Sequence, residues 1–238
     1  MNLRTATATT VLIIMAGYST LCVADHLKNT STETGLMQVS MIDTSDEGAV
    51  NNYKQKLKEH MVQGYEKALE TNDDTVGWIH VEDTRVDYPI MSGDNNFYLN
   101  YNSSKQPSKS GSIFLDDSEL WIGDLSVIHG HNMKNGTMFS DVRKFVEKKF
   151  FNNHSVYIYD GTELREYRPI AFLKINGNSK LQTTLKDKKE IQKYAESLVK
   201  ESDFGHREVN ENPVLVMNTC VSDGTEQHYI LVSQEVSE

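Results

Sequence analysis

The spacing of apolar residues predicts three amphipathic helices. In residues 50–70, apolar side chains recur every four residues along one stripe: Tyr53, Leu57, Met61, Tyr65 and Leu69. In residues 187–202 they follow the i, i+3, i+4, i+7, i+8 pattern: Ile191, Tyr194, Ala195, Leu198 and Val199. Asp187 and Glu190 resemble a capping box at the start of this second helix. A third helix is predicted over residues 138–150, with one apolar face: Phe139, Val142, Phe145 and Val146.

Elsewhere the pattern favours short strands. Eight apolar segments are separated by polar turns: 77–81, 86–91, 112–115, 125–129, 155–159, 165–175, 214–219 and 228–233. Pro89 lacks a backbone N–H, so we expect the segment 86–91 to be an edge strand or to end near this residue. Eight short strands with two inserted helices predict a mainly antiparallel sheet that closes into a barrel.

The N-terminal region differs from the rest of the chain. Arg4 precedes an uncharged stretch over residues 5–24, long enough to span a bilayer but rich in Thr and Ser. We favour an uncleaved anchor over residues 1–25, with a cleaved signal peptide as the alternative. Residues 26–49 are rich in Ser, Thr, Asp and Glu, which is typical of a flexible stalk. The predicted globular domain is therefore 50–238, on the outer face of the cell membrane.

Charge and cysteine content narrow the function. The 238 residues carry a formal charge of −10, which argues against nucleic acid as a partner. Of the two cysteines, Cys22 lies in the N-terminal segment, which leaves Cys220 without an intramolecular partner in an exported domain. Cys220 ends the apolar run 214–220, where a strand gives way to a polar turn. It is either a buried structural thiol or a nucleophile.

A cysteine nucleophile needs a proton partner, which is usually a histidine. His131 follows the strand 125–129, after Gly130, and opens a loop rich in Gly and Asn. Such a position can project an imidazole into a cleft, although a simple hydrogen bond within the loop is the alternative. His129 and His131 are two residues apart, but no carboxylate or cysteine stands at metal-ligand spacing. We therefore predict neither a metal site nor a cofactor.

Several motifs, in order, resemble those of the class B sortases. The segments are NDDTVGWI at 72–79, VDYPI at 86–90, DNNFYL at 94–99, KSGSIFLD at 109–116 and HGHNMKNGTMF at 129–139. The family's nucleophile motif, Thr-Leu-x-Thr-Cys, falls on VMNTC at 216–220. The resemblance covers about residues 50–235. Each motif is weak alone, and it is their number and order that make the resemblance specific.

The resemblance implies a fold and an activity. Sortases are membrane-anchored cysteine transpeptidases of Gram-positive cells, built on an eight-stranded β-barrel. Class B adds an N-terminal helix and a long helix, here 187–202, before the strand that carries the cysteine. Cys220 would be the nucleophile that attacks the carbonyl after Thr in a C-terminal sorting motif, and His131 the general acid/base. An amine, from a peptidoglycan cross-bridge or a pilin lysine, would then resolve the acyl-enzyme.

One family residue is missing from its place. The family has an arginine on the last strand, facing the cysteine, and His228 stands at that position here. We favour the interpretation that His228 weakens the enzyme, and expect His228→Arg to speed transpeptidation. The alternatives are that an imidazolium takes the arginine's role, or that the alignment is out of register.

Two other functions are alternatives to a transpeptidase. One is a catalytically weakened module that only binds a sorting peptide or pilin. The other, a papain-like protease, fits poorly because that family's cysteine precedes its histidine, whereas here His131 precedes Cys220.

Overall fold

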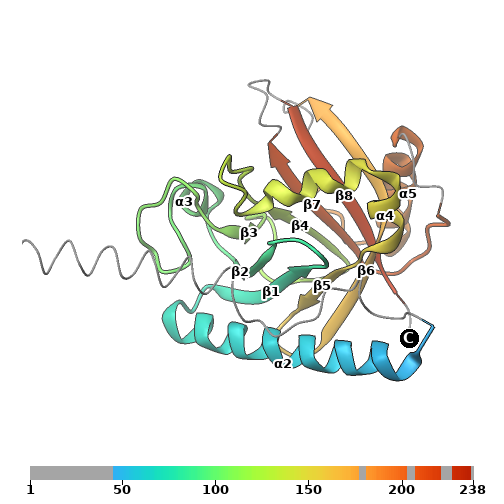
Figure 1. The fold of residues 1–238 in the computed structure, drawn as a ribbon. Coiled ribbons are helices and arrows are strands. Elements are labelled where there is room, and N and C mark those ends of the chain that lie inside the picture. The colour runs from blue at the N-terminus through green and yellow to red at the C-terminus, as the bar shows by residue number, and fades with distance from the viewer. Residues whose placement is uncertain (1–44, 177–180, 203–206, 221–226, 237–238) are drawn as a thin grey trace, which may run out of the picture. The chain divides into compact units, whose positions relative to one another are not determined.

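The computed structural model describes residues 45–176, 181–202, 207–220 and 227–236. Eight strands close into a barrel in the order β1-β2-β3-β4-β7-β8-β6-β5 (Figure 1), which confirms the predicted fold class. The strands are β1 Thr75–Val81, β2 Asp87–Met91, β3 Ile113–Leu115, β4 Leu125–His129, β5 Val156–Tyr159, β6 Leu164–Asn176, β7 Val214–Cys220 and β8 Gln227–Glu235. The pairs β2–β3 and β4–β7 are parallel and the other pairs are antiparallel, so the barrel is mixed.

The expectation that Pro89 marks an edge strand is wrong. β2 lies between β1 and β3, and Pro89 pairs with Trp78 of β1. The pairing of β2 with β3 starts only at Ile90. A missing N–H at Pro89 therefore interrupts no pairing with β3, which is how a proline is tolerated inside this barrel.

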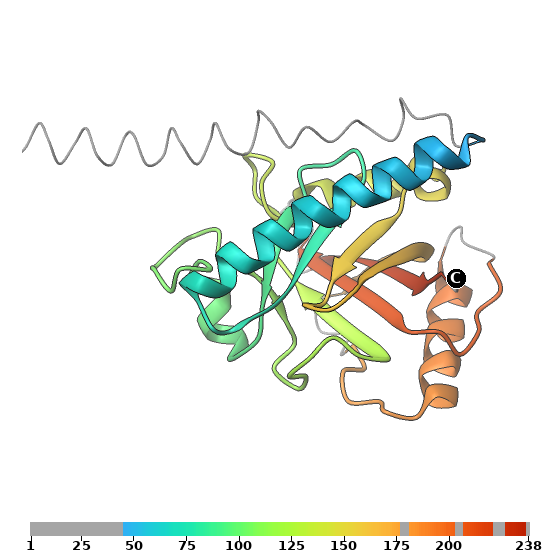
Figure 2. The same ribbon diagram turned by 90° about the horizontal axis from the view of Figure 1, so that it is seen from below.

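The first predicted helix is α2, Glu47–Thr71, which lies along the outside of the barrel against β1, β2 and β5 (Figures 1 and 2). It starts three residues before its predicted position, because the Asp46 side chain caps it by accepting from the N–H groups of Gly48 and Ala49. The predicted stripe is buried over its first half: Tyr53, Leu57 and Met61. Leu69, at the far end, is exposed.

The segment 138–150 is not the single α-helix that we predicted. It forms a 3-10 helix, η2 Phe139–Val146, followed by a separate short α-helix, α4 Lys148–Asn153. Phe139, Val142 and Phe145 are all buried and stand three residues apart. A 3-10 helix repeats every three residues, so this spacing suits it, and Val146 then points to solvent.

The strands β4, β7 and β8 bury both of their faces. Inside the barrel, Ile128, Met217 and Leu231 join the main apolar cluster. The alternate residues face outward and pack beneath α5, Lys188–Glu201, whose N-cap is Asp187 as predicted: Leu125, Val127, Val214, Val216, Ile230 and Val232. The outward face of these strands, beyond α5, carries the residues of the candidate site.

In the part of the chain that the structure describes, none of the helices has both the length and the apolar character of a membrane span. The predicted anchor at 1–25 and most of the predicted stalk lie outside the described residues.

Candidate active site

The predicted site residues come together where neighbouring strands end. Cys220 is the last residue of β7 and pairs with His228 near the start of β8. His129 ends β4 and pairs with Asn218 of β7. Because β4 and β7 are parallel, their C-terminal ends lie at the same end of the barrel. The loop that carries His131 therefore leaves β4 at the end of the barrel where β7 reaches Cys220. The structure describes the backbone of Cys220 but not its side chain, and residues 221–226 lie outside the description.

Gly130 lets the chain leave β4 at this edge. Its N–H donates to the Asn218 carbonyl at 3.2 Å, two residues before Cys220. A Cβ atom at Gly130 would lie 2.4 Å from Ile113 Cδ1 and 2.8 Å from the Phe139 ring, so a side chain does not fit there. Close packing around this glycine therefore holds the loop next to β7.

His131 is fixed by a hydrogen bond to the short helix α3, Asn95–Asn100, which the sequence analysis did not predict. Its Nε2 lies 2.8 Å from the Leu99 carbonyl oxygen. A carbonyl can only accept, so Nε2 carries the hydrogen and Nδ1 is the acceptor nitrogen of the neutral ring. The partner lies in α3 rather than within the loop, and this hydrogen bond sets the orientation of the half-buried imidazole.

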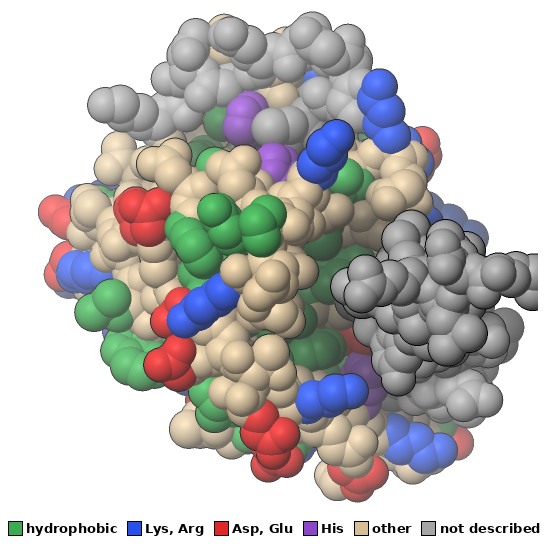
Figure 3. Space-filling model, turned by 90° about the vertical axis from the view of Figure 1, so that its left-hand side faces the viewer, with side chains coloured by type: hydrophobic (Ala, Val, Ile, Leu, Met, Phe, Trp, Pro, Cys, Tyr) green, Lys and Arg blue, Asp and Glu red, His purple; other side chains and the backbone are tan. Residues whose placement is uncertain are grey.

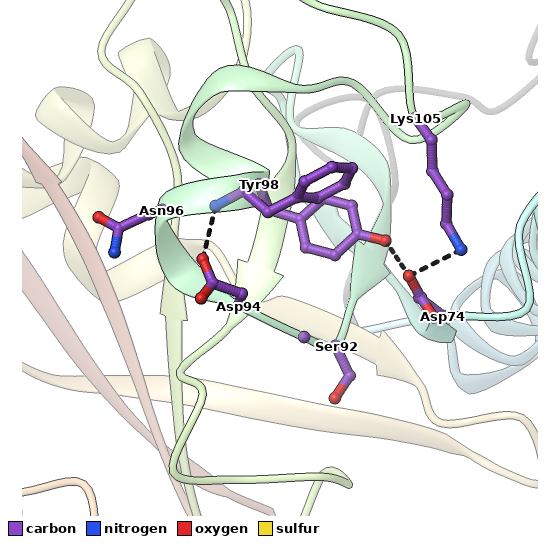
Figure 4. Close-up of a pocket in the computed structure, with 8 residues that line it drawn as sticks. Asp74, Ser92, Asp94, Asn96, Tyr98 and Lys105 are labelled. Atoms are coloured by element: carbon purple, nitrogen blue, oxygen red, sulfur yellow. Dashed lines mark hydrogen bonds and ion pairs between the residues drawn. The ribbon is translucent and has the colours of Figure 1, made fainter.

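A pocket of about 610 Å³ lies beside α3 (Figure 4). Its polar groups bind one another: the Tyr98 hydroxyl donates to Asp74, and Lys105 lies 3.0 Å from the same carboxylate. Asp94 caps α3 through the N–H of Phe97. These contacts fasten α3 to the barrel, and α3 in turn presents the Leu99 carbonyl to His131.

His228 of β8 is the register partner of Cys220. Its Nδ1 is 2.8 Å from Asn218 Oδ1. Burial, together with the neighbouring His129, lowers the pKa of His228. The lowered pKa favours the neutral ring, which speaks against His228 acting as a permanent imidazolium in the arginine's place.

The sequence analysis considered His129 only as a metal ligand, and it missed Asp116 and Asn218, which connect with His129 to His228. His129 Nε2 lies 3.0 Å from Asp116, and His129 Nδ1 lies 2.9 Å from Asn218 Nδ2. Hydrogen bonds from His129 and Ser118 outweigh burial and hold the pKa of Asp116 well below its usual range. Only the strand register and the contact between the two side chains place His129 and Asp116 beside Asn218. On the side drawn in Figure 3, histidine side chains reach the surface among mostly uncharged atoms.

No group of three or more His, Cys, Asp or Glu residues able to hold a metal ion occurs among the described side chains.

Comparison with known proteins identifies the family. Residues 79–236 match the model of the sortase domain, which is more than half of the chain. The chain belongs to the sortase family. Its members are cysteine transpeptidases, and relatives and solved structures that this sortase matches are named sortase B.

Three relatives illustrate the similarity. This sortase is 41% identical to sortase B of Listeria monocytogenes over 92 residues, a match that spans 37% of each chain. It is 25% identical to sortase B of Staphylococcus aureus over 174 residues, or 69% of this chain and 70% of that one. The crystal structure of sortase B from Clostridium perfringens superposes with a TM-score of 0.67 at 30% identity, covering 72% of this chain and 99% of the other.

Proposed function

We propose that this sortase is a transpeptidase in which Cys220 is the nucleophile and His131 the general acid/base. The observation that supports this most directly is the shared sheet edge: β7 ends at Cys220 where the loop bearing His131 leaves the parallel strand β4. Nucleophile and proton carrier must be neighbours for covalent catalysis, and the parallel register of β4 and β7 supports the assignment.

The proposed reaction has two steps. His131 Nδ1 takes the proton of the Cys220 thiol. The thiolate attacks the carbonyl carbon of Thr in a sorting motif, which forms a C–S bond and breaks the peptide C–N bond that follows Thr. His131 gives its proton to the departing amine. An acceptor amine then attacks the thioester, its proton passes to His131, and the thiolate leaves. Because Nε2–H of His131 donates to Leu99, we assign the exchanged proton to Nδ1.

The substrate and location are part of the same proposal. The acceptor is either a peptidoglycan cross-bridge, which anchors a surface protein, or a pilin lysine, which polymerises subunits. The N-terminal segment would hold the domain on the outer face of the cell membrane. Neighbouring genes that encode a C-terminal sorting motif would discriminate between the two roles.

Mass spectrometry of the trapped acyl-enzyme tests the function. The full-length protein is incubated with a panel of short peptides that carry candidate sorting motifs. We expect one peptide to add its N-terminal fragment to Cys220, and the adduct to disappear when an amine such as triglycine is added. Cys220→Ala should form no adduct.

The other outcome would favour the second candidate function. A protein that binds a sorting peptide but never forms a thioester would be a binding module, as weighed above for a chain with His228 in the arginine's place. Loss of the adduct in His131→Ala, with peptide binding retained, would support the role given to His131.

A further inference from the structure

A row of four polar side chains crosses the outer face of the sheet. Asp116 directly follows β3, His129 ends β4, Asn218 is in β7, and His228 is near the start of β8. These four strands are consecutive neighbours in the barrel. The row therefore runs across the strands rather than along them, and it ends at the register partner of Cys220.

Each link of this row has hydrogen-bond geometry. The separations are 3.0 Å from Asp116 Oδ2 to His129 Nε2, 2.9 Å from His129 Nδ1 to Asn218 Nδ2, and 2.8 Å from Asn218 Oδ1 to His228 Nδ1. Asp116 is itself held by the Ser118 hydroxyl at 2.7 Å and by Asn95 at 3.3 Å. The row is anchored at the end far from Cys220.

Donor and acceptor roles along the row follow from its first member. The Asp116 carboxylate can only accept, so His129 Nε2 carries a hydrogen. The Asn218 amide turns its NH₂ group to His129 Nδ1 at 2.9 Å, and an NH₂ group only donates, so Nδ1 is the acceptor nitrogen of His129. The Asn218 oxygen then faces His228, so His228 Nδ1 must donate. In the neutral ring of His228, Nε2 is consequently the acceptor nitrogen.

We propose that Asp116, His129 and Asn218 are positioning residues that hold His228 in the Nδ1–H tautomer beside Cys220. Whatever Nε2 of His228 meets at this edge, the imidazole accepts a hydrogen bond from it. His228 therefore cannot supply the hydrogen bonds that an arginine would give to an oxyanion. It instead offers an acceptor to an N–H or S–H group of the acylation site. The catalytic part of this inference rests on the proposed function.

Nitrogen-15 NMR of the histidine rings tests the tautomer directly. The full-length protein is labelled at histidine, and the signals of His228 are assigned by comparison with His228→Gln. We expect the wild-type His228 signals to be those of an Nδ1–H ring. In Asn218→Leu, which keeps the side-chain size but cannot accept, we expect the Nε2–H form to appear. In Asn218→Asp, which still accepts from His228, the Nδ1–H form should persist.

A second histidine–aspartate pair supplies the control. His154 Nε2 lies 3.0 Å from Asp83, at similar burial to the His129–Asp116 pair. Asp83→Asn should leave the His228 signals unchanged. An Nε2–H ring in the wild type, or the same tautomer in wild type and Asn218→Leu, would overturn the inference.

Kinetics extend the test to catalysis. With a peptide that acylates Cys220, Asn218→Leu should raise kcat by roughly 10-fold with little change in KM, because the Nε2–H ring then offers the oxyanion a donor that the wild-type ring lacks. An unchanged kcat would refute the positioning role in catalysis. If the wild type forms no thioester while the tautomer results hold, the proposed function fails and the structural assignment of His228 stands.

Discussion

The side chain at position 228 determines how many N–H groups can be donated beside the proposed nucleophile, Cys220. His228 is half-buried, its pKa is lowered, and its Nδ1 donates to Asn218. A neutral imidazole has one N–H, whereas a guanidinium has five and keeps its charge at every relevant pH. The contact with Asn218 needs only a donor, so an arginine at this position can retain it.

We therefore expect His228→Arg to raise the rate of transpeptidation. The added N–H groups can stabilise the oxyanion of the tetrahedral intermediate, an effect worth ~10²-fold or more where such a donor is removed from other enzymes. The measurement is kcat/KM with the acylating peptide, alongside a thermal melt to show that the fold is intact. Equal or slower turnover by a folded Arg variant would disprove the idea that His228 limits the enzyme.

Gly130 is a second residue at which a substitution has a clear expected effect, because there is no space for a side chain there. A methyl group at Gly130 meets Ile113 Cδ1 at 2.4 Å, and we expect Gly130→Ala to cost about 1–3 kcal/mol of unfolding free energy and to displace His131. Gly123→Ala is the matched control, because the nearest atom to its Cβ would be the Trp121 carbonyl oxygen at 4.0 Å. Urea unfolding of both variants gives the comparison. Similar losses in the two would contradict the packing argument.

At the scale of elements, α2 is attached to the barrel through a half-buried carboxylate, that of Asp87. Asp87 of β2 lies 2.7 Å from His60 Nε2 of α2 and 2.7 Å from the Trp78 indole nitrogen of β1. Burial would raise the pKa of Asp87, but hydrogen bonds from His60 and His80 outweigh it and hold that pKa well below its usual range. The hydrogen bond to Asp87 raises the pKa of His60.

These shifts predict how the helix contributes to stability as pH changes. A raised histidine pKa stabilises the fold fully below about pH 6.5, and the effect is lost as pH rises through the folded-state pKa. The lowered pKa of Asp87 stabilises above about pH 4 and is lost only in stronger acid. We expect His60→Gln to destabilise the protein more at pH 5.5 than at pH 9, as measured by urea midpoints. An equal loss at both values would mean that the charge on His60 does not matter.

The sequence predicts structure that depends on the residue pattern within one helix or strand. It does not predict structure that depends on contacts between elements. The stripes of α2 and α5 and the bounds of β4 follow from local periodicity. Residues 138–150 were predicted as one α-helix because Val146 was counted with the apolar face, whereas burial follows the three-residue spacing. The short helix α3 is too brief to show a period. Cys220 and His131 stood out by chemistry, but Asn218 and Asp116 gained meaning only from the strand register.

At the scale of the whole molecule, the strands β4, β7 and β8 join two apolar clusters. Their inward residues pack inside the barrel and their outward residues pack under α5. Leu231 and Ile230 are adjacent in β8, face opposite sides and are fully buried. The two clusters share β4, β7 and β8, so the unfolding of either one distorts strands that also carry residues of the other.

We therefore expect the domain to unfold in a single transition. Leu231→Ala and Ile230→Ala should each cost about 2–5 kcal/mol. In both variants, tryptophan fluorescence and far-ultraviolet circular dichroism should shift to the same new midpoint. A separate early transition in Ile230→Ala alone would show that α5 and its cluster unfold independently of the barrel.

The parallel pairing of β4 with β7 also sets when the enzyme can first become active during folding. His129 and Asn218, which mark this pairing, are 89 residues apart in the chain. Contacts of such long range form late, because the entropy cost of closing a large loop comes before the free energy that the contact contributes. Cys220 thus meets the loop of His131 only once most of the barrel exists. If Cys220 and His131 act as proposed, a partly folded chain carries the thiol before its proton partner is in place, and the order of assembly delays acylation.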